Sequence, residues 1–286
     1  MRISFWGVRG SYPVPGPNTV RYGGHTSCVE ARCEGGGCLI VDAGTGLRAL
    51  GHQLAEAQGA RPWQYHIALS HVHWDHIQGL PFFTPVFRPD AVIDIHGPRQ
   101  DEGPLLDVFT GVMRPPYFPI TPAQLGGTVT FLDTDNDDFA VNGAKVRARW
   151  VRHTDPTLGY RVELEGSSVT YISDHGPGCV PDDADDYIPD AVLELCDGVD
   201  VLIHDAQHTT HEYETKRHFG HSTIDYAVHV AREAGTKTLV LFHHCPSHGD
   251  AAVDEILDYA RDLSAETNGP EVVAAHEGMR LDLSRP

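Results

Sequence analysis

Residues 70–76 read Ser-His-Val-His-Trp-Asp-His and follow a predicted strand, Tyr65–Leu69. Three histidines and one aspartate therefore lie within six residues at a strand end. Imidazole and carboxylate groups are the ligands that borderline-soft divalent metals prefer. A loop that leaves a strand can turn His71 and His73 one way and Asp75 and His76 another. The spacing therefore predicts a site for two adjacent metal ions.

Further ligand-type residues stand at the ends of other predicted strands. Each of them alone is more often a packing or capping residue. Their shared position is informative, because loops at one edge of a sheet are where α/β proteins assemble sites. These residues are Asp42, His153, Asp174 and His243.

Short β-type runs alternate with helical patterns along the chain, without an internal repeat. Two strand-rich halves, each with helices, predict an α/β protein in which two mixed sheets pack face to face with helices on the outer faces. The length suits one domain over residues 1–286. The predicted strands are 2–8, 28–33, 38–41, 65–69, 92–96, 129–132, 146–151, 158–164, 169–172, 199–204, 238–242, 272–274 and 279–283, with helices at 45–57, 222–234 and 251–263.

Composition bears on partners and compartment. The chain has 21 Lys and Arg against 40 Asp and Glu, a formal charge of −19. Such a charge argues against binding to nucleic acid or an anionic membrane. No apolar run approaches the ~20 residues that a membrane span needs. The beginning of the sequence lacks a secretory pattern and the cysteines are scattered, so we expect a cytoplasmic protein with free thiols, although Cys33 and Cys38 could face each other across a glycine turn at 34–37.

The element His71-x-His73-x-Asp75-His76, with Asp42 before it and three further residues after it in order, resembles the metallo-β-lactamase superfamily. This resemblance implies an αββα sandwich with a dinuclear metal site at one edge. It implies zinc ions foremost, with manganese or iron as alternatives. One ion would be bound by His71, His73 and His153, and the other by Asp75, His76 and His243, with Asp174 bridging and Asp42 orienting the ligands.

Within the superfamily the pattern is most similar to the ribonuclease Z-like phosphodiesterase branch. The segments that carry this similarity are 153–160, 171–174, 204–206 and 220–223. The resemblance implies that Asp205 and His221 form a pair close to the leaving group, with Asp in the place of Glu. Asp75, Asp205 and His221 are therefore the catalytic candidates.

The chemistry implied is hydrolysis by a hydroxide that bridges two metal ions and attacks phosphorus. His221, polarised by Asp205, would give the leaving alkoxide its proton. Residues 161–173 leave room for a hairpin only, whereas ribonuclease Z carries a long arm there for tRNA. With the charge of −19, this predicts that a nucleic acid polymer is an unlikely partner. The expected substrate is a small-molecule phosphodiester, such as a cyclic nucleotide or nucleotide-type diester.

Several details of the site are open on sequence alone. The Pro- and Gly-rich stretch 97–127, with Phe109, Tyr117 and Phe118, could form a lid that stacks on a base. His25 and His248 are candidate substrate contacts. A homodimer is a candidate assembly, because exposed edges in such sandwiches often dimerise.

Three alternative functions compete with a phosphodiesterase. One is a hydrolase of another bond, such as an ester, lactone or thioester. The second is a ribonuclease Z-type RNA-processing nuclease, and the third is a metal-binding sensor without catalysis. The pair Asp205 and His221 favours chemistry at phosphorus.

Overall fold

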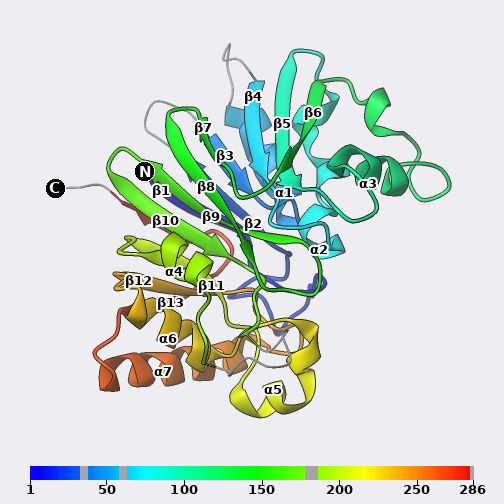
Figure 1. Ribbon diagram of the computed structural model, residues 1–286. Coiled ribbons are helices and arrows are strands. Elements are labelled where there is room, and N and C mark those ends of the chain that lie inside the picture. Colours follow the sequence, from blue (N-terminus) through cyan, green and yellow to red (C-terminus); the bar gives the residue numbers. More distant parts are fainter. Residues whose placement is uncertain (33–37, 58–62, 178–185, 284–286) are drawn as a thin grey trace.

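The computed structural model describes residues 1–32, 38–57, 63–177 and 186–283. The chain forms two seven-stranded mixed sheets that face each other (Figure 1). The first sheet has the order β14-β1-β2-β3-β4-β5-β6 and the second the order β13-β12-β11-β10-β9-β8-β7. The predicted αββα sandwich is confirmed.

The first sheet combines an antiparallel part and a parallel part. Strands β3 to β6 run parallel, whereas β14, β1, β2 and β3 alternate in direction. Its strands are β1 (Arg2–Gly7), β2 (Cys28–Arg32), β3 (Cys38–Val41), β4 (Trp63–Ala68), β5 (Ala91–Pro98), β6 (Thr128–Thr134) and β14 (Arg280–Asp282).

The second sheet is mixed in the same way. Strands β10 to β13 run parallel and β7 to β10 antiparallel. Its strands are β7 (Asp138–Val141), β8 (Ala144–Val151), β9 (Thr157–Leu164), β10 (Ser167–Ile172), β11 (Val201–Asp205), β12 (Thr238–Phe242) and β13 (Glu271–Ala274). Every residue of β11 is buried, as expected for a parallel strand covered on both faces.

Three apolar layers hold the sandwich together. A central layer between the sheets includes Phe5, Tyr160 and Phe242. A second layer packs α1 (Gly46–Ala57) and α3 (Leu105–Val112) on the outer face of the first sheet. A third packs α4 (Asp190–Cys196), α6 (Ile224–Glu233) and α7 (Asp250–Glu266) on the outer face of the second. Figure 1 shows α6 and α7 along that side, with α5 (Thr210–Lys216) beyond the end of the sheet.

The sequence predictions differ from the structure at a few elements. The stretch 97–127, predicted to be irregular, contains α3, because its prolines lie outside the run 105–112. Strand β7 and the helices α4 and α5 were not predicted. The glycine turn at 34–37 and Cys33 lie outside the described residues, whereas Cys38 is a free thiol. No helix within the described residues is long and apolar enough to cross a membrane.

Candidate metal centre

The ligand-type residues meet because six strands from both sheets end at one edge. In the first sheet, Asp42 follows β3 and the segment 70–76, which includes α2 (Trp74–Ile77), follows β4. In the second sheet, His153, Asp174, Asp205 and His243 stand at the ends of β8, β10, β11 and β12. Parallel strands bring their carboxyl ends to the same side of a sheet, where α/β proteins usually bind ligands.

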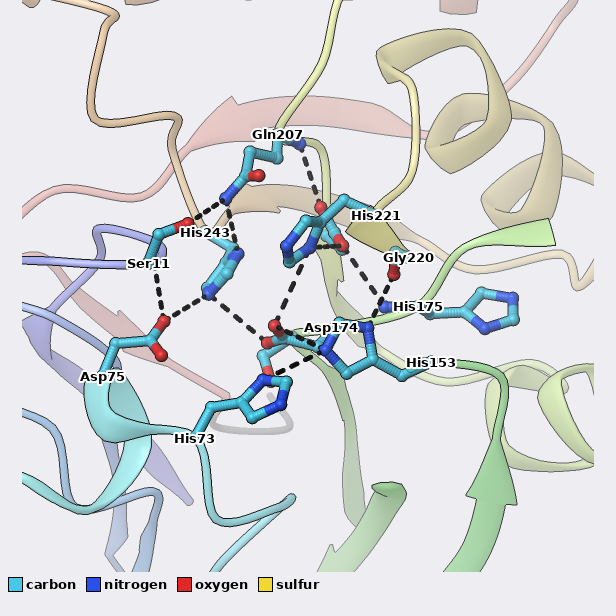
Figure 2. Close-up of polar contacts among 12 residues, drawn as sticks. Ser11, His73, Asp75, His153, Asp174, His175, Gln207, Gly220, His221 and His243 are labelled. Atoms are coloured by element: carbon cyan, nitrogen blue, oxygen red, sulfur yellow. Dashed lines mark hydrogen bonds and ion pairs between the residues drawn. The ribbon is translucent and has the colours of Figure 1, made fainter. Parts of the chain in front are cut away.

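Two groups of three side chains lie on the two sides of Asp174. His71, His73 and His153 offer nitrogen atoms that all lie within 4.8 Å of one another. Asp75, His76 and His243 form a second group with the same property. Figure 2 shows side chains of both groups pointing toward Asp174.

The carboxylate of Asp174 presents one oxygen to each group. Its Oδ1 lies 3.8 Å from Nε2 of His71 and 3.8 Å from Nε2 of His153. Its Oδ2 lies 3.2 Å from Nε2 of His76 and 3.4 Å from Nε2 of His243. A carboxylate in this position can bridge two cations.

Hydrogen bonds fix which nitrogen of each histidine faces the centre. Nδ1 of His153 donates to the Gly220 carbonyl over 2.8 Å, so Nε2 faces inward. His73 is turned the other way: its Nε2 bonds to Asp155 over 2.8 Å, and its Nδ1 lies 3.3 Å from Nε2 of His153. Partners of this kind set the tautomer of a metal ligand.

Buried atoms without partners indicate that the residues fit a pair of metal ions. Nε2 of His71, Nε2 of His76 and Oδ2 of Asp174 are inaccessible to solvent and lack a hydrogen bond of acceptable geometry. Each such atom costs about 1–3 kcal/mol when nothing satisfies it. Cations bound between the two groups would satisfy all three.

The charges of the centre lead to the same conclusion. Burial lowers the pKa of His71, and it lowers that of His153 to about 4, so both imidazoles are neutral and able to bind a metal. Burial alone would raise the pKa of Asp75 and Asp174, but the surrounding histidines hold both well below the ordinary value. Burial alone would lower the pKa of His76, yet the carboxylates around it raise it well above the ordinary value. The carboxylates thus favour a positive charge among them.

The carboxylate of Asp42 accepts five hydrogen bonds although it is completely buried. It accepts from Nδ1 of His76 over 2.7 Å and from the hydroxyl of Tyr171 over 2.6 Å. The backbone N–H and the hydroxyl of Ser70 supply two more, over 2.7 and 2.9 Å, and the hydroxyl of Ser173 supplies the fifth, over 3.5 Å. Asp42 therefore fixes the ring of His76 with its Nε2 toward the centre.

His243 is held by a close backbone approach. The amide of Gln207 lies 3.2 Å from its Nδ1. Gly10 packs against its ring, and a Cβ added to Gly10 would lie 2.6 Å from Cε1 and Nδ1 of His243. Only glycine leaves room for the ring at this position.

Asp205 and His221 form a buried pair beside both groups. Nδ1 of His221 lies 2.9 Å from Oδ2 of Asp205, so the shorter side chain of aspartate is long enough for the bond. Backbone N–H groups of Gln207 and His175 donate to Asp205 over 2.9 and 3.2 Å. Burial raises the pKa of Asp205 and lowers that of His221. The ring of His221 lies 5.2 Å from that of His153 and 5.0 Å from that of His243.

A cavity of about 830 Å³ opens onto the centre. Its walls include residues that the sequence analysis did not single out for the site. They come from the loop after β1, from the segment after β11, from the end of α5 with the following 3₁₀ turn η5 (Arg217–Phe219), and from the loop after β12. These residues are Ser11, Tyr12, Gln207, His208, Lys216, His218, Phe219, Cys245, Pro246 and Ser247.

The two candidate substrate contacts lie elsewhere. Nδ1 of His25 bonds to the hydroxyl of Thr45 over 3.2 Å. Nε2 of His248 bonds to Glu212 over 2.9 Å. Neither histidine is among the described residues that line the cavity.

The possibility that residues 97–127 form a lid over the cavity gains no support from their placement. None of the described cavity-lining residues comes from this stretch. Phe109 is buried against the first sheet, Phe118 packs edge-on against Phe82, and Tyr117 is 73% exposed. The apolar side of α3 is buried in the layer on the outer face of the first sheet. This packing keeps α3 on that face.

Comparison with known proteins agrees with this geometry. The sequence model described as a beta-lactamase superfamily domain matches residues 38–244. The chain belongs to the metallo-β-lactamase superfamily. The match includes the segment 71–76 and every other residue of the two groups, so the protein is a metal-dependent hydrolase of this superfamily.

Full-length relatives extend the comparison. Ribonuclease Z of Haloarcula marismortui is 25% identical over 321 aligned positions that cover 100% of this chain and 98% of the relative. The metallo-β-lactamase fold protein YhfI of Bacillus subtilis has a TM-score of 0.72 at 18% identity, with 98% of each chain covered. The short form of human tRNase Z has a TM-score of 0.66 at 24% identity, with 100% of each covered. The two structural likenesses show the fold.

These relatives correct one prediction. The net charge and the short segment 161–173 led us to expect that a nucleic acid polymer is an unlikely partner, in favour of a small-molecule phosphodiester. The full-length relatives include enzymes named ribonuclease Z and tRNase Z, which contradicts that exclusion. Net charge failed as a criterion because it sums the whole surface, whereas a substrate meets only the face around the cavity. Strands β9 and β10 form a hairpin, as predicted for residues 161–173, but this hairpin does not exclude RNA as a substrate.

Proposed function

We propose that this hydrolase is a phosphodiesterase in which His71, His73 and His153 bind one divalent ion, and Asp75, His76 and His243 bind a second. Asp174 bridges the two and Asp42 orients His76. The observation that carries this proposal is the position of Asp174, with Oδ1 directed to one group and Oδ2 to the other. When bound, the two ions supply an activated water and neutralise the charge that builds on the phosphoryl oxygens.

The donor set favours zinc, because imidazole and carboxylate ligands suit it well. Manganese and iron bind the same kinds of ligand, so they are alternatives to zinc. Burial keeps the imidazoles of His71 and His153 neutral, and the surrounding histidines keep Asp174 charged by holding its pKa well below the ordinary value. The site is therefore prepared for cations at neutral pH.

His221 is the proposed proton donor to the leaving group. Its Nδ1 is engaged by Asp205, which leaves Nε2 for the substrate. Asp205 holds the ring in this orientation, from which Nε2 could pass a proton to the leaving oxygen. General acid catalysis of this kind contributes about 10²–10⁴-fold to the rate.

Two substrate classes are candidates. RNA is the first, because a relative aligned over the whole chain is named ribonuclease Z. A small nucleotide-type diester is the second, because a cavity of about 830 Å³ is large enough for a nucleotide. Both present a phosphodiester to the same metal centre.

The proposal is tested by comparing diester and ester hydrolysis. Purified protein loaded with zinc or with manganese is assayed on bis(p-nitrophenyl) phosphate, on a cyclic nucleotide, on a precursor tRNA and on p-nitrophenyl acetate. We expect turnover of at least one diester and its loss after chelation. Ester hydrolysis without diester hydrolysis, or metal binding without any turnover, would refute the phosphodiesterase.

A further inference from the structure

The mouth of the cavity carries three exposed aromatic side chains. Tyr12, Trp74 and Phe219 are 58%, 59% and 51% exposed, and all three line the cavity. They come from three separate segments, namely the loop after β1, the beginning of α2 and the end of η5. Single exposed aromatic residues are ordinary on a protein surface, but several around one cavity indicate binding.

Each of the three is tied by the chain to the metal centre. Trp74 stands between His73 and Asp75. Tyr12 follows Ser11, whose backbone N–H donates to Asp75 over 2.7 Å. Consecutive Cα atoms are about 3.8 Å apart, so these aromatic residues cannot be far from the site of bond cleavage.

Phe219 is close along the chain to the proposed acid, His221. It precedes His221 by two residues, with Gly220 between them in the left-handed region at a φ of 78°. Its ring lies 4.3 Å from the ring of His218, which also lines the cavity. The turn thus places the aromatic ring of Phe219 at the cavity wall, two residues from the proposed acid.

The charges of the cavity wall explain why aromatic contacts matter here. Among the described lining residues, Lys216 is the only lysine or arginine. Its ammonium group lies 3.4 Å from the carboxylate of Glu212, so its charge is partly neutralised. Proteins that hold nucleic acid through phosphates use many lysines and arginines, and this wall does not supply them. Substrate binding must then depend mainly on stacking of a base on aromatic rings, which does not require charged side chains.

We propose that Tyr12, Trp74 and Phe219 form an aromatic rim that stacks the unpaired base next to the scissile phosphodiester. The inference rests on the proposed phosphodiesterase activity and names its substrate as a nucleotide with an accessible base. Unpaired bases of RNA are commonly held on aromatic rings in this way. The rim binds the base, while the centre below it acts on the phosphate.

The test compares two substrates with the same leaving group. Thymidine 5′-(p-nitrophenyl phosphate) carries a base, whereas methyl p-nitrophenyl phosphate does not. We expect the metal-loaded enzyme to have a lower KM for the nucleoside substrate. Trp74→Ala and Phe219→Ala should each raise that KM by about 5- to 150-fold, which corresponds to about 1–3 kcal/mol of stacking. Both variants should reduce kcat/KM by a much larger factor for the nucleoside substrate than for the methyl substrate.

Control variants separate stacking from damage to the centre. Tyr117→Ala removes an exposed aromatic side chain that does not line the cavity, and it should change KM for neither substrate. Trp74→Phe keeps an aromatic face and should restore most of the affinity with the metal content unchanged. Because few phosphates would be held by charge, KM for the nucleoside substrate should depend only weakly on salt.

The outcomes distinguish the two proposals. If the wild type hydrolyses neither substrate nor any other diester, the phosphodiesterase is refuted and the rim with it. If the wild type hydrolyses both with equal KM, or if the alanine variants affect both equally, the phosphodiesterase stands and the aromatic rim is refuted. A steep salt dependence would also contradict binding by stacking.

Discussion

Oδ2 of Asp42 lies 2.7 Å from Nδ1 of His76, and neither side chain is exposed to solvent. Asp42 directly follows β3, and His76 lies on α2 in the segment that follows the adjacent parallel strand β4. The same relationship links the first sheet to the second, because Tyr171 of β10 donates to the same oxygen.

Asp42→Asn should weaken metal binding without removing a ligand. The neutral amide lacks the negative charge with which the Asp42 carboxylate accepts from His76. Changes of this kind typically lower metal affinity by about 10- to 100-fold. Competition with a chromogenic chelator measures the affinity. Asp94→Asn is the matched control, because Asp94 forms a similar pair with His66, at 3.6 Å, on β4 and β5. Equal effects of the two variants would contradict the orienting role.

Gly10→Ala should displace His243 and reduce the metal content from two ions per chain toward one. The new Cβ would overlap the imidazole ring, which has no other space because it is completely buried. Elemental analysis of the purified protein measures the content. Gly16→Ala in the same loop is the control, since its Cβ would meet nothing within 4 Å. Full metal content in Gly10→Ala would show that His243 is not a ligand.

Removal of the metal ions should lower the melting temperature. Buried carboxylates and unpartnered imidazole nitrogens would then lose the cations that satisfy them, and ligands that bind only the folded state stabilise it by mass action. Calorimetry of the protein before chelation, after it and after zinc is restored measures the effect. A melting temperature that does not change would indicate that the centre is stable without metal.

Glu212→Gln should destabilise the protein in a pH-dependent manner. Burial alone would raise the pKa of Glu212, but hydrogen bonds from the Thr209 backbone and from His248 lower it to about 2. A depressed pKa stabilises the fold above the ordinary value of 4.5, and this contribution is lost as the pH falls from 4.5 to about 2. The difference in free energy of unfolding between wild type and variant should shrink across that range.

Urea denaturation at a series of pH values measures this difference. Glu214→Gln, which changes an exposed residue of the same helix, serves as the comparison. A difference that stays constant down to about pH 2 would contradict the role of the Glu212 charge.

The central parts of the fold could be predicted because their signals are local. Strands β3 and β12 have the predicted bounds, and the ligand-type residues stand where buried apolar runs end. The carboxyl ends of parallel strands lie at the same edge of a sheet, independently of the conformation of the loops that follow them. The segment 70–76 carries four of the ligand-type side chains on one short loop and helix.

The walls of the cavity could not be predicted in the same way. Phe219 and Lys216 lie on short elements whose positions depend on contacts between distant segments. A signal for α5 was present, since Thr209 and Glu212 form a capping box at its beginning. Nothing local distinguishes Phe109, which is buried in the core, from Phe219, which lines the cavity.

We propose that His221 protonates the leaving group of a phosphodiester and that the metal centre assembles without this residue. The most direct measurement compares wild type and His221→Ala on thymidylyl-thymidine and on thymidine 5′-(p-nitrophenyl phosphate), with metal content determined in parallel. An alkoxide needs a proton to leave, whereas p-nitrophenolate does not. We predict a loss of about 10²-fold or more on the dinucleotide, a small loss on the nitrophenyl ester, and unchanged metal. Equal losses on both substrates, or loss of metal, would contradict the account.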